Sequence, residues 1–333
     1  MSGAEPGPPA GRGSRAGPEP GPPAASGPGS HDALLADLRP SAFAIAYRML
    51  GSVAEAEDVV QEALLRVHAA LERGEQLSSP RAYIAKVVTR LAIDQLRSAR
   101  ARRETYVGEW LPEPLVSDPD QGRGDPAREA EMADSLSLAF LVLLESLTPE
   151  QRAAFLLHDV FDYGYSEVAS IVQKSEDNAR QLAARARRHV AEGRPRFETS
   201  RERRDELARR FIAAAQEGDL GGLESLLAHD VALHGDGGGK VPALARSIHG
   251  RARVARTLSA WWRQGARRAG TSARIAEVNG QPGLLMVAPD GGLIGVMALD
   301  IADDTIQSIR SIVNPDKLRH IGEVADLRAF LGT

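Results

Sequence analysis

The chain has 333 residues, of which 43% are hydrophobic and 26% are charged, and its formal net charge is −4. This length predicts about two or three domains, and the composition is typical of soluble globular proteins. Cysteine is absent, which excludes disulfides, thiolate metal sites and cysteine nucleophiles and fits a cytoplasmic location. No apolar run approaches the ~18 residues of a membrane span, so we expect no membrane partner.

The first 30 residues are mainly Gly, Pro, Ala and Ser, with almost no large apolar side chain. A segment of this composition cannot bury enough surface to offset its chain entropy. It also lacks the apolar core of a signal peptide. We therefore predict a disordered tail over 1–30, and a short C-terminal tail over 321–333.

Helical patterning begins near Asp32 and continues to about Arg103, which predicts a helical domain over 31–103. Ser52 and Glu55 have the spacing of a capping box at the start of an amphipathic helix. On that helix an apolar stripe leaves a polar, mainly acidic face, which on composition alone could simply be solvated. The face consists of Glu55, Asp58, Gln61 and Glu62.

A second long helix is predicted to open with Ser79 at its N-cap and Pro80 at its first helical position. One side of it is apolar, and the other side is basic and is opposed only by Asp94. On its own this pattern is typical of a solvated arginine-rich surface. The basic side chains are Lys86, Arg90, Arg97 and Arg100, followed by Arg102 and Arg103.

Residues 104–134 change in character, because prolines interrupt any helix and acidic side chains dominate. This composition predicts an acidic linker that is mobile in part. A second helical domain is predicted over 135–195. In it, Thr148 and Gln151 form a capping box around Pro149.

The segment Ser166–Arg188 predicts a helix-turn-helix, with Ser166 and Ser175 as N-caps and Gln173 in the turn. A recognition helix uses its N-terminal residues for base edges and its basic side chains for phosphates. Arginine suits guanine, and Asn or Gln suits adenine. We expect base contacts from Asn178, Arg180, Gln181 and Arg185, and phosphate contacts from Arg187 and Arg188.

The last domain, over 200–320, is predicted to be α+β, because helices precede a meander of alternating strands. Helices are expected over about 202–216, 219–228 and 250–264. Asp290-Gly291-Gly292 predicts a hairpin turn. The expected strands are Ser272–Val278, Gly283–Ala288, Leu293–Ile301 and Thr305–Val313.

The segment Tyr47–Val67 closely resembles the polymerase-binding helix of the extracytoplasmic-function sigma factors, which pair a region 2 and a region 4 domain. The resemblance implies that 31–103 is region 2 and 135–195 is region 4, so core RNA polymerase (the β′ clamp and the β subunit) and promoter DNA are the expected partners. It assigns the polymerase contact to Asp58, Gln61 and Glu62. It also implies recognition of the −10 element by region 2 and of the −35 element by region 4, with −10 contacts at Arg90, Asp94, Arg97 and Arg100.

The C-terminal domain resembles the SnoaL-like, cone-shaped α+β fold. Three short motifs occur in the sigma-factor subgroup that carries such a domain in place of a separate anti-sigma factor. The resemblance implies regulatory contacts at these motifs. They are Trp110-Leu111-Pro112-Glu113-Pro114, Asp236-Gly237-Gly238-Gly239-Lys240 and Asn314-Pro315-Asp316-Lys317-Leu318.

Each motif has an ordinary alternative. The glycine run could be a plain loop, and it is not a P-loop. Asn314-Pro315 is a common strand stop. Trp110 is harder to explain in a proline-rich linker, since an indole usually needs to be buried. We therefore expect it to dock on region 2 or on the C-terminal domain, which would hold the sigma domains in a compact, less active arrangement.

Other functions remain alternatives. Members of the SnoaL-like fold include isomerases and cyclases, but no pair among the candidate acid–base groups has a spacing that demands catalysis. We therefore expect no enzyme, no cofactor and no metal, while a small apolar ligand in the cone stays open. The competing classes are a ligand-binding helix-turn-helix transcription factor that acts without polymerase, an enzyme fused to a DNA-binding adaptor, and a pure interaction module. The acid–base candidates are His234, Asp236, His249 and Asp300.

Overall fold

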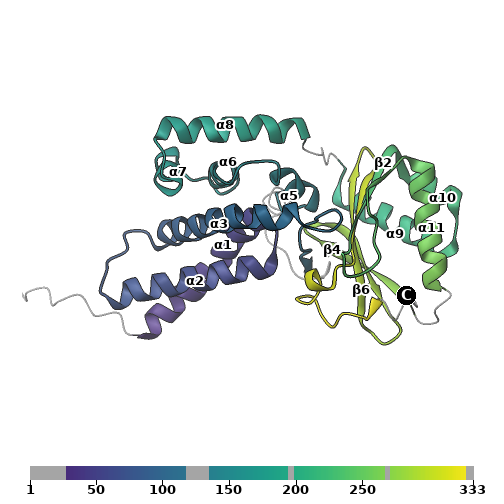
Figure 1. Cartoon of the computed structure of the whole chain (residues 1–333), viewed down its shortest axis with the longest axis horizontal. Helices are drawn as coiled ribbons and strands as arrows, with labels where there is room; N and C mark the ends of the chain where they lie inside the picture. The colour runs from purple at the N-terminus through teal and green to yellow at the C-terminus, as the bar shows by residue number, and fades with distance from the viewer. Residues whose placement is uncertain (1–27, 118–134, 194–198, 267–270, 328–333) are drawn as a thin grey trace, which may run out of the picture.

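The computed structural model describes residues 28–117, 135–193, 199–266 and 271–327. Helices make up its first part, and a sheet covered by helices makes up its second (Figure 1). The expected α+β class of the C-terminal domain and the helical class of the two preceding domains are confirmed. The predicted tail over 1–30 is too long by three residues, because 28–30 belong to the first helix; residues 1–27 lie outside the described residues.

The first helical domain consists of α1 (Pro28–Leu50), α2 (Val53–Glu72) and α3 (Pro80–Glu104). The predicted N-caps of α2 and α3 are confirmed. Ser52 Oγ accepts from Glu55 N at 3.2 Å, and Ser79 Oγ accepts from Ala82 N at 3.2 Å. Helix α1 begins at Pro28, four residues before the predicted start.

The second helical domain contains α5 (Leu138–Leu144), α6 (Pro149–Phe155), a π-helical turn (Leu156–Val160), α7 (Tyr165–Val172) and α8 (Glu176–Gly193). The capping box at Thr148 is confirmed, because the Thr148 and Gln151 side chains each accept from the other residue's backbone N–H.

Helices α7 and α8 form the predicted helix-turn-helix, with one correction. The expected cap at Ser166 is wrong, because Glu167 accepts from the backbone N–H of Gly164 at 3.0 Å and so starts the helix at Tyr165. Ser175 caps α8 as predicted, accepting from Asn178 N at 3.3 Å. Gln173 occupies the turn with φ +57°, a left-handed conformation that glycine usually supplies.

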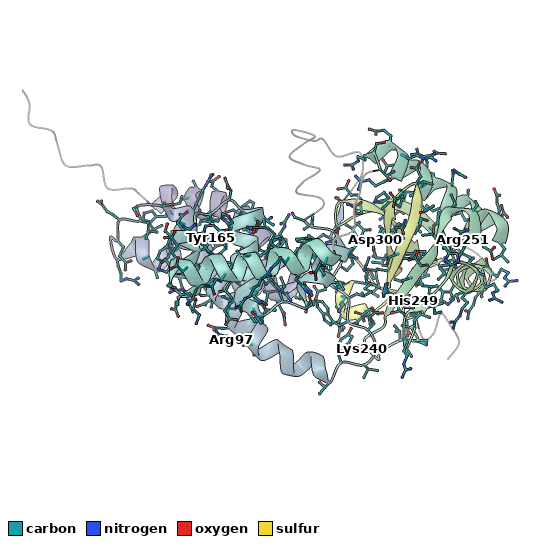
Figure 2. The ribbon with its side chains drawn as sticks, turned by 90° about the horizontal axis from the view of Figure 1, so that it is seen from above. Arg97, Tyr165, Lys240, His249, Arg251 and Asp300 are labelled. Carbon is teal, nitrogen blue, oxygen red and sulfur yellow. The ribbon has the colours of Figure 1, made fainter. Side chains whose placement is uncertain are left out.

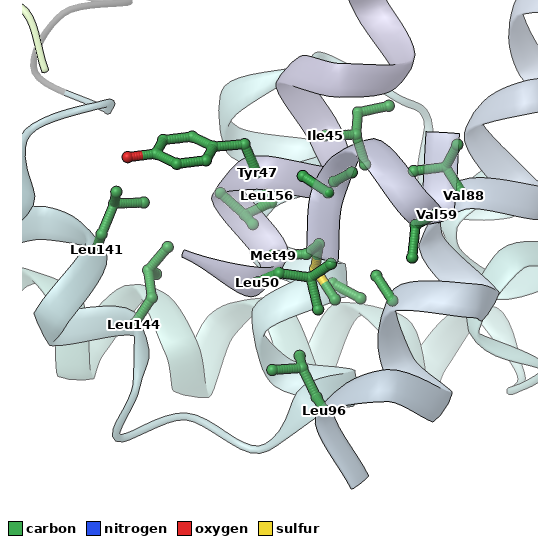
Figure 3. Packing of buried hydrophobic residues seen from close by; sticks show 14 of the residues in the cluster. Ile45, Tyr47, Met49, Leu50, Val59, Val88, Leu96, Leu141, Leu144 and Leu156 are labelled. Carbon is green, nitrogen blue, oxygen red and sulfur yellow. The ribbon is translucent and has the colours of Figure 1, made fainter. Parts of the chain in front are cut away.

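The two helical domains share one apolar core. Figure 3 shows residues of α1, α2 and α3 beside residues of α5 and the π-helical turn. The same cluster continues into the C-terminal sheet through Ala276, Val278 and Leu285. The three domains are therefore joined by buried apolar surface, which is the dominant favourable term in association.

The C-terminal domain has helices on one face of a sheet (Figure 1). The helices are α9 (Arg201–Glu217), α10 (Leu220–Leu226) and α11 (Arg251–Ala266), and a 3-10 turn follows at Pro315–Lys317. The strands are β2 (Leu227–Asp236), β3 (Ile248–His249), β4 (Ser272–Val278), β5 (Gln281–Val287), β6 (Leu293–Ala302) and β7 (Thr305–Ile312). The four predicted strands are confirmed to within two residues, as is the turn at Gly291, where φ is +89°.

The sheet order is β1-β4-β5-β6-β7-β2-β3, with β2 parallel to β7 and the other neighbours antiparallel. Strand β1 (Val116–Ser117) comes from the linker, and Val116 pairs with Val278 of β4. The linker residues 105–117 are thus part of the folded structure, and residues 118–134 of the predicted linker lie outside the described residues.

Candidate nucleic-acid interface and interdomain junction

Helix α2 presents the polar face predicted from its sequence. Asp58, Gln61 and Glu62 are all exposed, and Glu62 is held by Arg66 at 2.8 Å. Leu65 continues the same face and is 58% exposed. The sequence interpretation missed Leu65, although its position four residues after Gln61 would have indicated it. The face therefore combines negative charge with exposed apolar surface, a combination suited to a protein partner.

On helix α8, all six side chains that were predicted to contact DNA are exposed: Asn178, Arg180, Gln181, Arg185, Arg187 and Arg188. Two of them also have partners in the domain. Arg180 lies over the Tyr165 ring at 4.8 Å, and Arg187 Nε donates to Asp159 at 2.8 Å. The hydrogen bond with Asp159 is the main reason that the pKa of Arg187 is raised.

The inner face of α8 differs in part from the expectation. Ala179 is buried as predicted, but Leu182 is only partly buried. The buried positions are Ala179, Ala183, Ala186 and Val190. Small residues on this face let α8 lie close to α6, which keeps the arginines on the outer side.

Helix α3 turns part of its basic side toward the second helical domain. Arg90 Nε donates to Ile171 O at 3.1 Å, and an Arg90 terminal nitrogen donates to Ser170 O at 2.9 Å. These carbonyls lie at the C-terminal end of α7, where a cation is favoured. In this arrangement the Arg90 guanidinium is bonded to the backbone of α7.

Arg97 also bridges the two helical domains. It donates to Glu150 of α6 at 2.6 Å and lies 3.4 Å from Asp94. The hydrogen bond with Glu150 raises the pKa of Arg97. Figure 2 shows Arg97 near the edge of the helical part of the chain. Asp94 is exposed, and the side chain of Arg100 lies outside the described residues.

The three motifs noted in the sequence meet at one interdomain junction, built around Asp236 at the end of β2. Asp236 is fully buried, and its carboxylate accepts from Tyr106 Oη at 2.5 Å and from Leu111 N at 2.9 Å. Lys317 Nζ lies 2.7 Å from the same carboxylate. One buried negative charge thus joins the linker to both C-terminal motifs.

Lys317 gives the junction its positive charge. Its ammonium group donates to the carbonyl of Leu111 and lies 4.3 Å from the Trp110 ring centroid and 5.0 Å from that of Tyr106. Asn314 Nδ2 donates to Tyr106 Oη at 2.9 Å. Burial and the bond to Asp236 raise the pKa of Tyr106, which keeps its hydroxyl protonated as a donor.

Trp110 connects the junction to the first helical domain. Gly51 has φ +66°, and a Cβ there would approach the Trp110 ring to 2.9 Å. Gly51 O also accepts from Glu113 N at 2.8 Å. Trp110 therefore lies between the α1–α2 turn and Lys317, in contact with both domains on which it was expected to dock.

Glu113 reinforces the start of α2. Its carboxylate accepts from Ser52 Oγ at 2.8 Å, from Val53 N at 2.7 Å and from Ala54 N at 3.2 Å. These bonds satisfy N–H groups that a helix start leaves without an intrahelical acceptor. A negative charge there is also favoured by the helix dipole.

The turn between β4 and β5 inserts into the same region. Asn279, at φ +52°, accepts from Leu115 N at 2.9 Å and donates to Leu136 O at 2.9 Å. Asn279-Gly280 is a typical type I′ hairpin pair, so the sequence carries a local signal for this turn.

The acid–base candidates do not form one site. His234 Nδ1 donates to Glu109 at 2.7 Å beside Ser247, and Asp300 pairs with buried Arg310. Burial alone would raise the pKa of Glu109, but the bond from His234 lowers it, and the net shift is downward. Burial lowers the pKa of Arg310 to about 10. Figure 2 shows His249 and Asp300 at separate places in the α+β domain.

A cavity of about 480 Å³ lies in the α+β domain, and none of the four acid–base candidates is among its lining residues in the described ranges. Within those ranges, no cluster of three or more His, Cys, Asp or Glu side chains is arranged for a metal ion. No helix of the described segments is both long and apolar enough to cross a bilayer.

Comparison with known proteins adds to this geometry. Sequence models of sigma-70 region 2 and sigma-70 region 4 match residues 34–102 and 137–190. The chain is 39% identical to the ECF RNA polymerase sigma factor SigJ of Mycobacterium tuberculosis, over 84% of this chain and 90% of that protein. It is 32% identical to the probable ECF sigma factor SigI of the same species, over 91% and 95% of the two chains.

Among solved structures, the crystal structure of the Mycobacterium tuberculosis extracytoplasmic function sigma factor SigJ is similar, with a TM-score of 0.68 and 34% identity. The similarity covers 86% of this chain and 98% of that one. It therefore extends beyond the two helical domains into the sheet-containing C-terminal domain.

Proposed function

The chain belongs to the extracytoplasmic-function RNA polymerase sigma factors, and from this we propose that it binds core RNA polymerase and directs transcription initiation at promoters with −10 and −35 elements. Asp58, Gln61 and Glu62 of α2 contact the β′ clamp. Leu65, the exposed apolar side chain beside them, adds to the same contact. The protein acts in the cytoplasm, where its polymerase is found.

The DNA contacts are divided between two helices. Region 4, over 135–195, reads the −35 element with Asn178, Arg180, Gln181 and Arg185 near bases and with Arg187 and Arg188 near phosphates. Region 2, over 31–103, uses Arg90, Asp94, Arg97 and Arg100 of α3 at the −10 element. The exposure of all six α8 side chains supports the first assignment.

The C-terminal domain, over 200–320, regulates this activity and works without catalysis. It holds the linker through the contact residues Trp110, Leu111 and Pro112, and through the two later motifs. The observation that carries this part is the Asp236 junction, together with the binding of Arg90 to the α7 carbonyls. The junction supports regulation because it holds the linker between the two helical domains, and the Arg90 contact supports it because promoter DNA would have to replace that contact.

Run-off transcription with core polymerase tests the proposal. The full chain should support initiation at its promoter, and a chain that ends near Arg196 should do so at a different rate, whose direction gives the sign of the regulation. Asp58→Ala should weaken polymerase binding at least tenfold. Glu72→Ala, an exposed acidic position at the far end of the same helix, is the matched control and should bind like the native chain.

If neither the full chain nor the truncated chain binds polymerase, the proposed polymerase contact at Asp58, Gln61 and Glu62 is wrong. A chain that binds duplex promoter DNA tightly without polymerase would favour a ligand-binding transcription factor. Equal transcription rates for the two chains would refute regulation by the C-terminal domain.

A further inference from the structure

The cavity of the α+β domain has a volume, about 480 Å³, within the range of sites that bind small organic molecules. Helix α11 contributes Trp261 and Trp262, and the strands contribute Met286 and Met297. We propose that this cavity binds an uncharged, largely apolar organic molecule, and that the bound molecule acts on the linker through the loop 237–244. The proposal rests on the function proposed above, in which the C-terminal domain regulates by holding the linker.

The lining decides the class of ligand. Among the described residues it contains indole, thioether and aliphatic groups, with neutral polar side chains such as Gln216, Gln264 and Ser311, and no charged side chain. A charge placed against these apolar groups would lose its hydration, which is costly. Indole rings offer flat apolar faces and one N–H donor each. The lining therefore favours an aromatic or polycyclic molecule that carries a hydrogen-bond acceptor.

The loop 237–244 separates the cavity from the junction. Its second half, Pro242, Ala243 and Leu244, lines the cavity. Its first half holds the linker side, because a Cβ on Gly239 would approach Val107 to 2.9 Å and a Cβ on Gly238 would collide with Asn314. Gly235, the residue before Asp236, also lines the cavity.

The two halves of the loop are in close contact. A Cβ on Gly237 would lie 2.7 Å from Ala243 and 2.6 Å from the carbonyl of Val241. Because close-packed segments of this kind transmit displacement instead of absorbing it, a molecule that presses on Ala243 moves the glycine run. The glycine run in turn contacts the linker at Val107 and contains Gly238, whose N–H donates to Asp236 at 3.0 Å.

Nile red, an uncharged apolar dye that fluoresces strongly when shielded from water, tests the site on the full chain. We expect saturable fluorescence enhancement. Ala273→Phe places a ring in the cavity and should weaken dye binding at least tenfold, and Ala273→Leu should weaken it less. Ala260→Phe is the matched control, because Ala260 is exposed beside Trp261 and does not line the cavity; its affinity should stay within twofold. Thermal unfolding checks that each variant folds.

Hydrogen exchange tests the coupling. The amides of Leu111 and Gly238 both donate to Asp236, so dye binding should change their exchange rates at least threefold in the native chain. Absence of saturable binding, or binding that both Ala273 variants leave unchanged, would overturn the site. Dye binding in the cavity with unchanged exchange at both amides would overturn the coupling. Neither measurement uses polymerase, so failure of the sigma-factor assignments would show separately, in the transcription assay.

Discussion

The side-chain amide of Asn279 donates a 2.7 Å hydrogen bond to the hydroxyl of Tyr47, so that a hairpin turn of the C-terminal sheet is fastened to the first helix of the chain. Both residues are buried. Tyr47 in turn donates to the carbonyl of Glu113 at 2.6 Å. The turn, the helix and the linker therefore share one chain of hydrogen bonds, whose members depend on one another.

The substitution Asn279→Gly should remove the hydrogen bond to Tyr47 without straining the turn, because glycine accepts the same positive φ. The change removes three side-chain hydrogen bonds and leaves buried groups without partners, so we expect a loss of about 2–4 kcal/mol in the free energy of unfolding. Urea unfolding measures it. Asp303→Gly, also at positive φ (49°) but exposed, should change stability by less than about 0.5 kcal/mol. Equal losses would contradict a role for the side chain.

The buried pair at the junction predicts a second result. Asp236→Asn leaves the Lys317 ammonium, whose side chain is 7% exposed, without its counter-charge, and breaking such a pair costs about 3–5 kcal/mol. Arg209→Gln breaks an exposed pair with Glu206 on α9, outside the three motifs, and such a pair is worth about 0–1 kcal/mol. Unfolding free energies of the two variants compare them directly. We also expect Asp236→Asn, but not Arg209→Gln, to alter the transcription rate; similar rates would argue against regulation through this junction.

Gly238 predicts a steric effect. A methyl group there would collide with Asn314 and push it away from Tyr106, in addition to the backbone strain of a positive φ. Gly218→Ala has a similar φ but nothing within 4 Å of the added carbon, so it measures the strain alone. The difference between the two stability losses should be about 1–3 kcal/mol. If the variants lose equal stability, the contact contributes nothing.

Buried Tyr47 and half-buried Tyr106 predict a pH dependence. The pKa values of Tyr47 and Tyr106 are raised, mainly by burial, above the ordinary value of 10.0. A raised folded-state pKa means that the stability from the protonated hydroxyls is complete below pH 10.0 and is lost as the pH rises through the folded pKa. Tyrosinate absorbance should show late-titrating groups, one fewer in Tyr106→Phe. A normal titration of all five tyrosines in the folded chain would contradict this.

The hydrogen bonds from Arg90 of α3 to the end of α7 predict that α7 becomes more mobile in an Arg90→Gln variant. The change removes the cation from the carbonyls of Ser170 and Ile171. Exchange at the C-terminal end of α7 should rise at least threefold in the free chain. Arg66→Gln changes an exposed arginine of α2, outside this contact, and should leave that exchange rate unchanged. If both variants behave alike, Arg90 does not hold the two helical domains together.

Local signals made much of the fold predictable. Ser79-Pro80, the Thr148 capping box and the strand meander depend on residues within a few positions of one another, and the structure follows them. The prediction of an N-cap at Ser166 was wrong because the Glu167 side chain accepts from the backbone N–H of Gly164. Local sequence allowed a helix start at either residue. Strand β1 was missed, since two residues have no period to detect.

The junction depends on distant contacts that no local pattern records. The motifs indicated Asp236 and Lys317, but Tyr106 and Asn279 carry no comparable signal of their partners, which lie 130 and 232 positions away. Glu113 belongs to the linker motif, but its contact with the start of α2 is tertiary and leaves no local pattern. The roles of the α2, α3 and α8 side chains toward polymerase and DNA stay predictions.

The paired strand β1 also sets the length of the tether between the two promoter-reading domains. With 105–117 bound to the C-terminal domain, 17 residues separate Ser117 from Ser135, and covalent geometry limits the distance that 17 residues can cover to roughly 60 Å. Release of 105–117 would add 13 residues and roughly 45 Å of reach. By binding the linker, the C-terminal domain thus limits the maximum separation of the two helical domains, and with it the distance between the two promoter elements that they could contact together.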